Sequence, residues 1–327
     1  MDGKCKYVSR NSQACQEAEL GNGYCFWHDP DVDKSGMDLT EKLQSYVHNG
    51  GLTHGLKLKR SNLKGLNLVN HNCPNGFDLS ESDFYRANLQ GAHLFNIILR
   101  HGSLMKANLH EANLHCAHLE QTNLLGIKLH NAKLDNLEVG SQLFQESLAH
   151  KHEQAGEHEM AQDHFEQAEE VYRHLRRNAE LNGLHGLHGL AGNFGYKELT
   201  MHRHLMPRWS LRRGFSYLVD ILCGYGEKPE NTVLFSLSLI IFSALGYFAF
   251  GVNNGTEILK FNADTDMMNN TSTFMLTLYY SVVTFTTLGY GDITPFGISR
   301  LIAAFEAFIG SFTIALFVVV FVKRMTR

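Results

Sequence analysis

A strict five-residue period dominates the hydrophobic pattern of the first half of this chain. Leucine or phenylalanine stands at every fifth position, at Leu79, Phe84, Leu89, Leu94, Leu99, Leu104, Leu109, Leu114, Leu119, Leu124, Leu129 and Leu134, and Val139 continues the series. An α-helix repeats about every 3.6 residues and a β-strand every 2, so neither explains a period of five. A fixed short repeat indicates a solenoid, whose repeats stack and cover each other's apolar faces.

Small residues often stand two positions before the large one, and the sequence ANL occurs at Ala87, Ala107 and Ala112. This pattern resembles the pentapeptide-repeat family, and the resemblance implies a right-handed quadrilateral β-helix with four pentads in each coil. With Leu58, Leu63 and Leu68, which are offset by one residue, we expect about four coils with a rise of roughly 4.8 Å over residues 52–140. The register slip at residues 71–76 predicts a loop or bulge.

The second half of the chain has a different pattern, with two long apolar stretches. Val233 to Val252 is uncharged, and Leu301 to Val322 contains one ionisable residue, Glu306. About 20 helical residues cross a hydrocarbon core of roughly 30 Å, so both stretches predict membrane-spanning helices. The apolar segment Thr273 to Phe285 between them is too short to span, and we expect it to enter the bilayer and turn back.

The sequence TTLGYGD, Thr286 to Asp292, follows this short segment directly. It resembles the selectivity filter of potassium channels, with leucine where valine is commoner. The resemblance implies that Thr287, Leu288, Gly289, Tyr290 and Gly291 form the K⁺ sites through backbone carbonyls and the Thr287 hydroxyl. Gly289 and Gly291 suit this role because glycine readily adopts positive φ. One chain supplies a quarter of the ion cage, so the resemblance also implies a homotetramer in the lipid bilayer.

Further residues are expected to support the filter, with Thr286 and Asp292 at its two ends. In the related channels an aromatic pair on the pore helix braces the filter, and Tyr279 and Tyr280 stand at the matching positions. We predict that Asp292 accepts a hydrogen bond from Tyr279. This chain departs from some relatives at Val283, where they carry an acid on the pore helix.

Two residues of the second span have alternative interpretations. Glu306 is costly to bury ionised in a membrane. It could support the filter by bonding pore-helix hydroxyls such as those of Ser281 or Thr284, or it could be an acid that faces an aqueous cavity. Gly310 matches the hinge glycine of related channels, but a small residue also permits close helix packing.

Charges around the spans predict the orientation in the cell (inner) membrane. Arginines precede the first span and Lys323, Arg324 and Arg327 follow the second, whereas the connecting segment is acidic. Positive residues favour the inner side, so we expect both termini in the cytoplasm. Residues 207–228 read as an amphipathic slide helix at the membrane surface, ahead of a pore domain at 231–327. Residues 141–206 read as a helical coupling segment with breaks at Gly156 and at 182–192, and it resembles a tetratricopeptide-like hairpin weakly.

The N-terminal 36 residues contain Cys5, Cys15, Cys25 and His28. Three thiolates and one imidazole suit tetrahedral Zn²⁺. So short a segment has too little apolar surface to fold without a bound metal or another cross-link. Structural zinc is therefore predicted, and free thiols are the alternative.

The sequence thus predicts a multidomain chain and a potassium channel controlled from its N-terminal side. Lys57 to Gly140 contains nine basic and seven acidic residues, a net charge near plus two, which excludes the strongly acidic DNA mimics of the pentapeptide family and gives no reason to expect a nucleic-acid partner. The solenoid could be a scaffold, an assembly surface, a ligand sensor or a spacer. An enzyme is not expected, because no nucleophile and base converge and no phosphate loop is present. The alternative function is a membrane-tethered scaffold that does not conduct.

Overall fold

A computed structural model describes residues 3–70, 76–181, 188–264 and 266–325. The chain divides into two compact units, residues 1–207 and 208–327, and each unit is described by itself. The predicted loop at 71–76 lies almost wholly outside the described residues.

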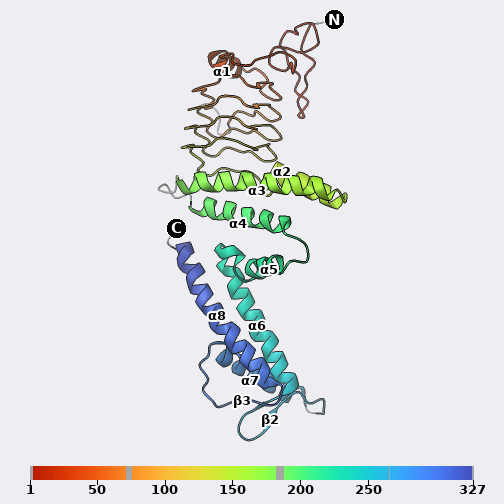
Figure 1. Cartoon of the computed structure of the whole chain (residues 1–327), viewed down its shortest axis with the longest axis vertical. Helices are drawn as coiled ribbons and strands as arrows, with labels where there is room; N and C mark the ends of the chain where they lie inside the picture. Colours follow the sequence, from red (N-terminus) through yellow and green to blue (C-terminus); the bar gives the residue numbers. More distant parts are fainter. Residues whose placement is uncertain (1–2, 71–75, 182–187, 265, 326–327) are drawn as a thin grey trace. The chain divides into compact units, whose positions relative to one another are not determined.

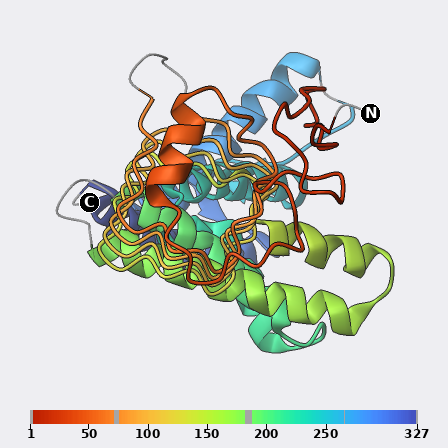
Figure 2. The same cartoon turned by 90° about the horizontal axis from the view of Figure 1, so that it is seen from above.

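The first unit contains the quadrilateral β-helix that the pentads predict (Figure 1). Single-residue bridges join successive coils in parallel, with an offset of 26 residues between Lys57 and Asp83 and of 20 residues from Asp78 onward. The predicted apolar positions point inward, and Leu109 and Leu114 are fully buried. Seen from above, the coils lie over one another (Figure 2). The position two residues before each leucine is not restricted to small residues, since Leu66 and Ile97 are also buried there.

Both ends of the solenoid are covered. The short helix α1 (Thr40–His48) buries Leu43 and Val47 against the first coil, an element that the sequence analysis did not predict. At the other end lie three helices, α2 (Phe144–Gln154), α3 (His158–Leu181) and α4 (His188–Leu205). Helix α3 contacts the last coil directly, because Asn178 donates a hydrogen bond to the carbonyl of Ala132 (3.2 Å). Capped ends prevent further coils from adding to the stack.

The predicted helical segment forms, with one correction. Gly156 (φ 79°) separates α2 from α3, and the expected stripe of α3 is buried, at Ala161, Phe165, Ala168, Tyr172 and Leu175. The first part of the predicted break at 182–192, residues 182–187, lies outside the described residues. Its second part is helical instead, because α4 begins at His188 and includes Gly189 and Gly192. Burial of Ala191 and Phe194 outweighs the low helix propensity of the neighbouring glycines.

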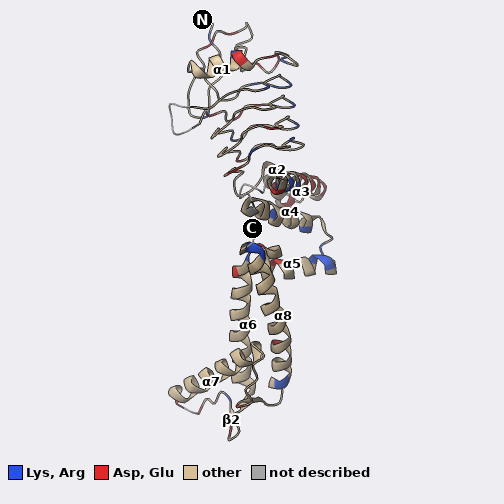
Figure 3. Ribbon diagram, turned by 90° about the vertical axis from the view of Figure 1, so that its left-hand side faces the viewer, with Lys and Arg blue, Asp and Glu red and all other residues tan. Residues whose placement is uncertain are grey.

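The second unit begins with α5 (Leu211–Cys223) and a 3₁₀ turn, η2 (Gly224–Gly226). Two long helices follow, α6 (Pro229–Phe250) and α8 (Ser299–Met325). The segment that connects them contains a third helix, α7 (Met267–Phe285), which packs against both. A small antiparallel sheet ties the loops together, in the order β2 (Ile258–Leu259), β1 (Val252–Asn253), β3 (Thr294–Pro295). Among the described residues, only α6 and α8 are long and apolar enough to cross a membrane, and charged residues are confined almost entirely to their ends (Figure 3).

The bounds of these helices differ from the sequence predictions. Helix α6 begins at Pro229, which the helix accommodates at its first position, and it ends before Gly251 (φ 94°), so Val252 belongs to a strand. Helix α7 begins six residues earlier than predicted, because the Asp266 side chain accepts a hydrogen bond from Met267 N (2.8 Å) and caps the helix. Its first turns are polar, and a search for apolar segments therefore overlooks them.

Candidate ion pathway and candidate metal centre

The filter sequence follows α7 without a break. Thr287 N donates to the carbonyl of Thr284 (3.0 Å) and Leu288 N to that of Val283 (3.1 Å), so the start of the filter is anchored on the end of the helix. The Thr286 hydroxyl donates to Val282 O (2.7 Å) and closes the last turn. Thr286 therefore holds the junction through its side chain.

Left-handed and ordinary backbone conformations alternate from Thr287 to Gly291. Thr287, Gly289 and Gly291 have φ of 57°, 59° and 79°, whereas Leu288 and Tyr290 between them do not have positive φ. Alternation of this kind turns successive carbonyl oxygens toward one side of the strand, which is the arrangement a dehydrated cation requires. A threonine at positive φ is strained, and such strain gathers at functional sites.

Tyr279 and Asp292 are brought together as the sequence predicts, with the Tyr279 hydroxyl donating to Asp292 Oδ2 at 2.9 Å. The hydrogen bond joins α7 to Asp292, the last residue of the TTLGYGD segment. Tyr280 has a different environment. It is 7% exposed and meets the ring of Tyr247 on α6 edge to face at 4.8 Å, so it packs α7 against the first long helix.

Glu306 lies at the junction of the three helices and is 1% exposed. Its carboxyl group contacts the Ser281 hydroxyl of α7 and accepts a hydrogen bond from the Tyr247 hydroxyl of α6 at 2.5 Å. Ser281 also donates to Ile240 O on α6 (2.8 Å). Sequence reasoning named Ser281 as a partner but missed Tyr247, since no sequence pattern links a tyrosine 59 residues away.

Gly310 is buried against Phe285, the last residue of α7. A Cβ at this position would stand 2.3 Å from the carbonyl oxygen of Phe285, closer than any real contact. Helix α8 is continuous through Gly310 in this structure. Close packing is thus one visible reason for glycine here, and a hinge stays a prediction.

Two ion pairs join the C-terminal end of α8 to the start of α6 and to Glu227, which lies just before that helix. Lys323 pairs with Glu227 at 2.6 Å, and Arg324 with Glu230 at 2.9 Å. The sequence analysis used these basic residues for orientation only, and their partners could not be chosen without the fold.

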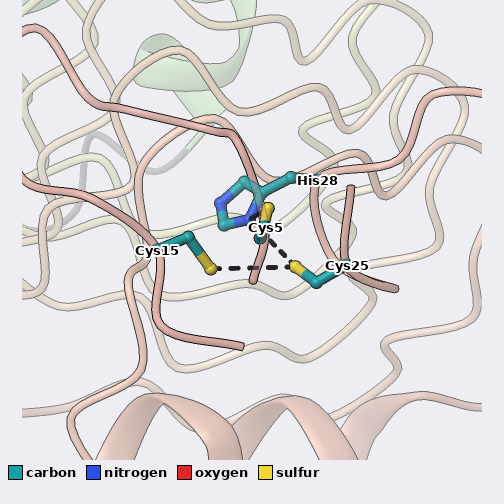
Figure 4. A group of neighbouring side chains, drawn as sticks. All are labelled: Cys5, Cys15, Cys25 and His28. Carbon is teal, nitrogen blue, oxygen red and sulfur yellow. Dashed lines mark hydrogen bonds between the residues drawn. The ribbon is translucent and has the colours of Figure 1, made fainter. Parts of the chain in front are cut away.

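Cys5, Cys15, Cys25 and His28 converge in the N-terminal segment (Figure 4). All four are buried, and their ligand atoms lie within 4.8 Å of one another. The sulfur atoms of Cys15 and Cys25 are 3.8 Å apart, and His28 Nδ1 lies 3.1 Å from Cys25 Sγ and 3.7 Å from Cys5 Sγ. A tetrahedron with metal–sulfur bonds of about 2.3 Å has sulfur atoms roughly 3.8 Å apart, so the group fits a metal ion.

The environment of these three cysteines and His28 favours a bound cation. His28 Nε2 donates to the carbonyl of His54 (2.8 Å), which leaves the lone pair of Nδ1 directed at the cysteines. Burial lowers the pKa of His28 to about 4 and so keeps the imidazole neutral. Burial also raises the pKa of Cys15 to about 12, and it raises that of Cys25. A bound divalent ion would supply the positive charge that thiolates need in this setting.

Comparison with known proteins covers both halves of the chain. Residues 234–327 match the family model described as ion channel, and residues 75–100 and 103–136 match pentapeptide repeats, with eight copies. The chain joins pentapeptide repeats to an ion-channel domain. It is therefore a membrane protein in which a channel domain follows a β-helix along the chain. No curated protein matches.

Solved structures match the repeat region. The pentapeptide repeat protein Rfr23 from the cyanobacterium Cyanothece 51142 is 21% identical and covers 28% of this chain and 85% of its own, with a TM-score of 0.23. HetL from Nostoc sp. PCC 7120 is 27% identical over 25% of this chain and 46% of its own, with a TM-score of 0.17. The protein alr5209 from Nostoc is 24% identical over 33% of this chain and 88% of its own, with a TM-score of 0.19.

Proposed function

We propose that this chain is one subunit of a homotetrameric channel that passes K⁺ selectively across the cell membrane. The observation that carries the proposal is the alternating backbone of Thr287 to Gly291, directly after a pore helix and inside a domain of the ion-channel family. Carbonyls on one side of a strand form a cage only when several copies surround an axis. The exposed side chains of Leu288 and Tyr290, at 59% and 67%, would then pack against neighbouring helices of the assembly.

A matched pair of glycines tests this role of the filter. Gly289 (φ 59°) and Gly297 (φ 55°) share a left-handed backbone, and a Cβ added to either would meet nothing within 4 Å. Alanine should therefore cost each position about the same, roughly 1–2 kcal/mol of backbone strain. We expect Gly289→Ala to abolish K⁺ flux into liposomes and Gly297→Ala to retain it. Equal flux through both variants would contradict the proposed filter.

The other filter residues receive supporting roles in this proposal. Asp292 and Tyr279 hold the outer end of the filter, Thr286 the inner end, and Tyr280 the pore helix. Glu306 fastens α8 to α6 and α7 through Tyr247 and Ser281. Ser281 also ties this cluster to the first long helix, because its hydroxyl donates to Ile240 O.

We also propose that Cys5, Cys15, Cys25 and His28 hold a structural Zn²⁺. The residues lie in a segment with few apolar contacts of its own, where metal binding would supply folding free energy. Metal analysis of the purified protein should find about one zinc per chain, and Cys25→Ser should lose it. A metal-free native protein with full stability would refute the site. Cys223, a buried thiol in the other unit, provides the control as Cys223→Ser.

The N-terminal unit is proposed to regulate the pore, with α2 to α4 as the coupling segment and α5 as a slide helix at the cytoplasmic membrane surface. Helix α5 exposes Leu211 (93%) and Phe215 (67%), and Trp209 just before it is fully exposed, as a membrane-surface helix requires. A scaffold that does not conduct is the competing function, and absence of any K⁺ flux from a folded, tetrameric preparation would favour it.

A further inference from the structure

A cavity of about 370 Å³ lies between the loop that follows His28 and the first coil of the solenoid. Residues 30–35 of the loop form one wall, and Lys57, Lys59, Arg60 and Tyr85 of the first two coils form the other. Backbone hydrogen bonds fix the two walls to each other, from Lys57 N to Trp27 O (2.8 Å) and from Gly36 N to Arg60 O (2.9 Å). The shape of the cavity is therefore fixed by the fold of the first unit.

The lining carries a positive excess, because four basic residues face two carboxylates, Asp31 and Asp33. Asp33 accepts a hydrogen bond from Ser35 N (2.9 Å) and lies near enough to Arg60 to feel its charge, without forming an ion pair. Within the described part of the chain, the side chains of Lys57 and Arg60 have neither a hydrogen bond nor an ion pair.

The two remaining cations of the lining already have partners. Lys59 pairs with Asp83 at 3.4 Å. Lys34 is 2% exposed, and its ammonium group donates to Asp29 O (3.1 Å). Lys34 is thus engaged inside the protein, and burial lowers the pKa of its ammonium group, whereas Lys57 and Arg60 are available to a ligand.

Arg60 also begins a column of like charges along one edge of the coils. Arg60, Arg86 and Lys106 occupy equivalent corners of successive coils, with φ of 55°, 54° and 58°. Arg60 N donates to Tyr85 O and Arg86 N to Met105 O, which places the three residues one above another. Stacked like charges at a spacing of roughly 5 Å repel. Neither Arg86 nor Lys106 forms an ion pair among the described residues, so the column attracts an anion.

We propose that this cavity binds a phosphate-bearing small molecule, most simply a nucleotide. Phosphate oxygens suit the ammonium of Lys57 and the guanidinium of Arg60, whose planar fork matches phosphate geometry. Tyr85 lines the same cavity, with the Arg86 guanidinium 5.3 Å from the centroid of its ring, so that the ring and Arg86 together offer a flat surface to a base. The limited volume and the solenoid's net charge of only about plus two favour a small molecule over a nucleic acid.

Calorimetric titration of the full-length protein in detergent tests the site with three probes, ATP, inorganic phosphate and adenosine. We expect saturable binding of ATP that weakens as salt is raised, weaker binding of phosphate, and none of adenosine. Arg60→Gln should weaken ATP binding by roughly tenfold or more, since it removes a charge-assisted contact. Glutamine is compatible with the backbone at this corner, because Gln121 occupies a corresponding left-handed position (φ 57°).

Lys133→Gln provides the matched control, as Lys133 is exposed on the same solenoid and lies outside the cavity. It should leave ATP affinity unchanged. The proposal is overturned if ATP shows no saturable binding to the wild-type protein, or if Arg60→Gln binds it as tightly as Lys133→Gln does. Phosphate binding as tight as ATP binding would overturn the nucleotide and retain the phosphate site. Thermal unfolding of each variant verifies that it is folded, and no step of the test depends on ion conduction.

Discussion

Gly310→Ala tests how the second long helix supports the filter. The added methyl group would stand 2.3 Å from Phe285 O and 3.0 Å from Phe285 C. Ordinary contact at such a position is 3.4–4 Å, so helix and carbonyl must separate by about 1 Å or more. Phe285 is the last residue of α7, and the filter begins two residues later at Thr287. Overpacking of this kind costs about 1–3 kcal/mol, and the displacement falls on the base of the filter.

The assay is K⁺ and Na⁺ flux into liposomes that contain the purified variant, with thermal stability measured beside it. If Gly310 serves close packing, Gly310→Ala should reduce K⁺ flux and lower the K⁺ to Na⁺ ratio of what remains. If Gly310 is only a hinge, the variant should open less often while the ratio stays at the wild-type value.

Gly246→Ala on α6 is the matched control. It is also a glycine within a membrane-spanning helix, but its added Cβ would meet the flexible end of Ile302, Cδ1, at 3.0 Å, and this group can move aside. Gly246→Ala should keep flux and selectivity. The packing argument fails if Gly310→Ala matches Gly246→Ala in stability, flux and selectivity.

Three further predictions concern single side chains. Tyr279→Phe removes the hydrogen bond to Asp292, so it should loosen selectivity or speed inactivation in single-channel recordings, and unchanged currents would count against a supporting role. Glu306→Gln keeps a hydrogen-bonding group in the cluster but cannot ionise, so conduction should persist while the response of the flux to pH flattens; a pH response equal to that of the wild type would exclude Glu306 as its origin. Leu114→Ala leaves a cavity in the solenoid core and should destabilise it by about 2–5 kcal/mol in denaturant unfolding, whereas Leu199→Ala, at a 43% exposed position, should have little effect; equal costs would refute the assigned core.

The repeat and the channel domain could both be predicted from sequence because each has a strong local pattern. The period of five determines which residues enter the core, and the burial of Leu109 and Leu114 follows from that period alone. The hydrogen bond between Tyr279 and Asp292 was predictable because both residues belong to one short motif region.

Features that depend on long-range contacts were missed or only partly predicted. Helix α1 has a short apolar stripe that becomes meaningful only when the first coil lies beneath it. The glycines at the start of α4 suggested a longer break, since propensity is a weak signal beside burial of Ala191. Tyr247 and the cavity beside Lys57 and Arg60 arise from residues distant in sequence, which no period or motif connects.

The most direct test of the central claim is the reversal potential of the wild-type channel in a planar bilayer, with K⁺ on one side and Na⁺ on the other. A filter lined by backbone carbonyls predicts a reversal potential far toward the K⁺ equilibrium value, with Na⁺ permeability lower by at least about tenfold, which corresponds to roughly 1.4 kcal/mol. A reversal potential near zero under these conditions would contradict a potassium-selective pore.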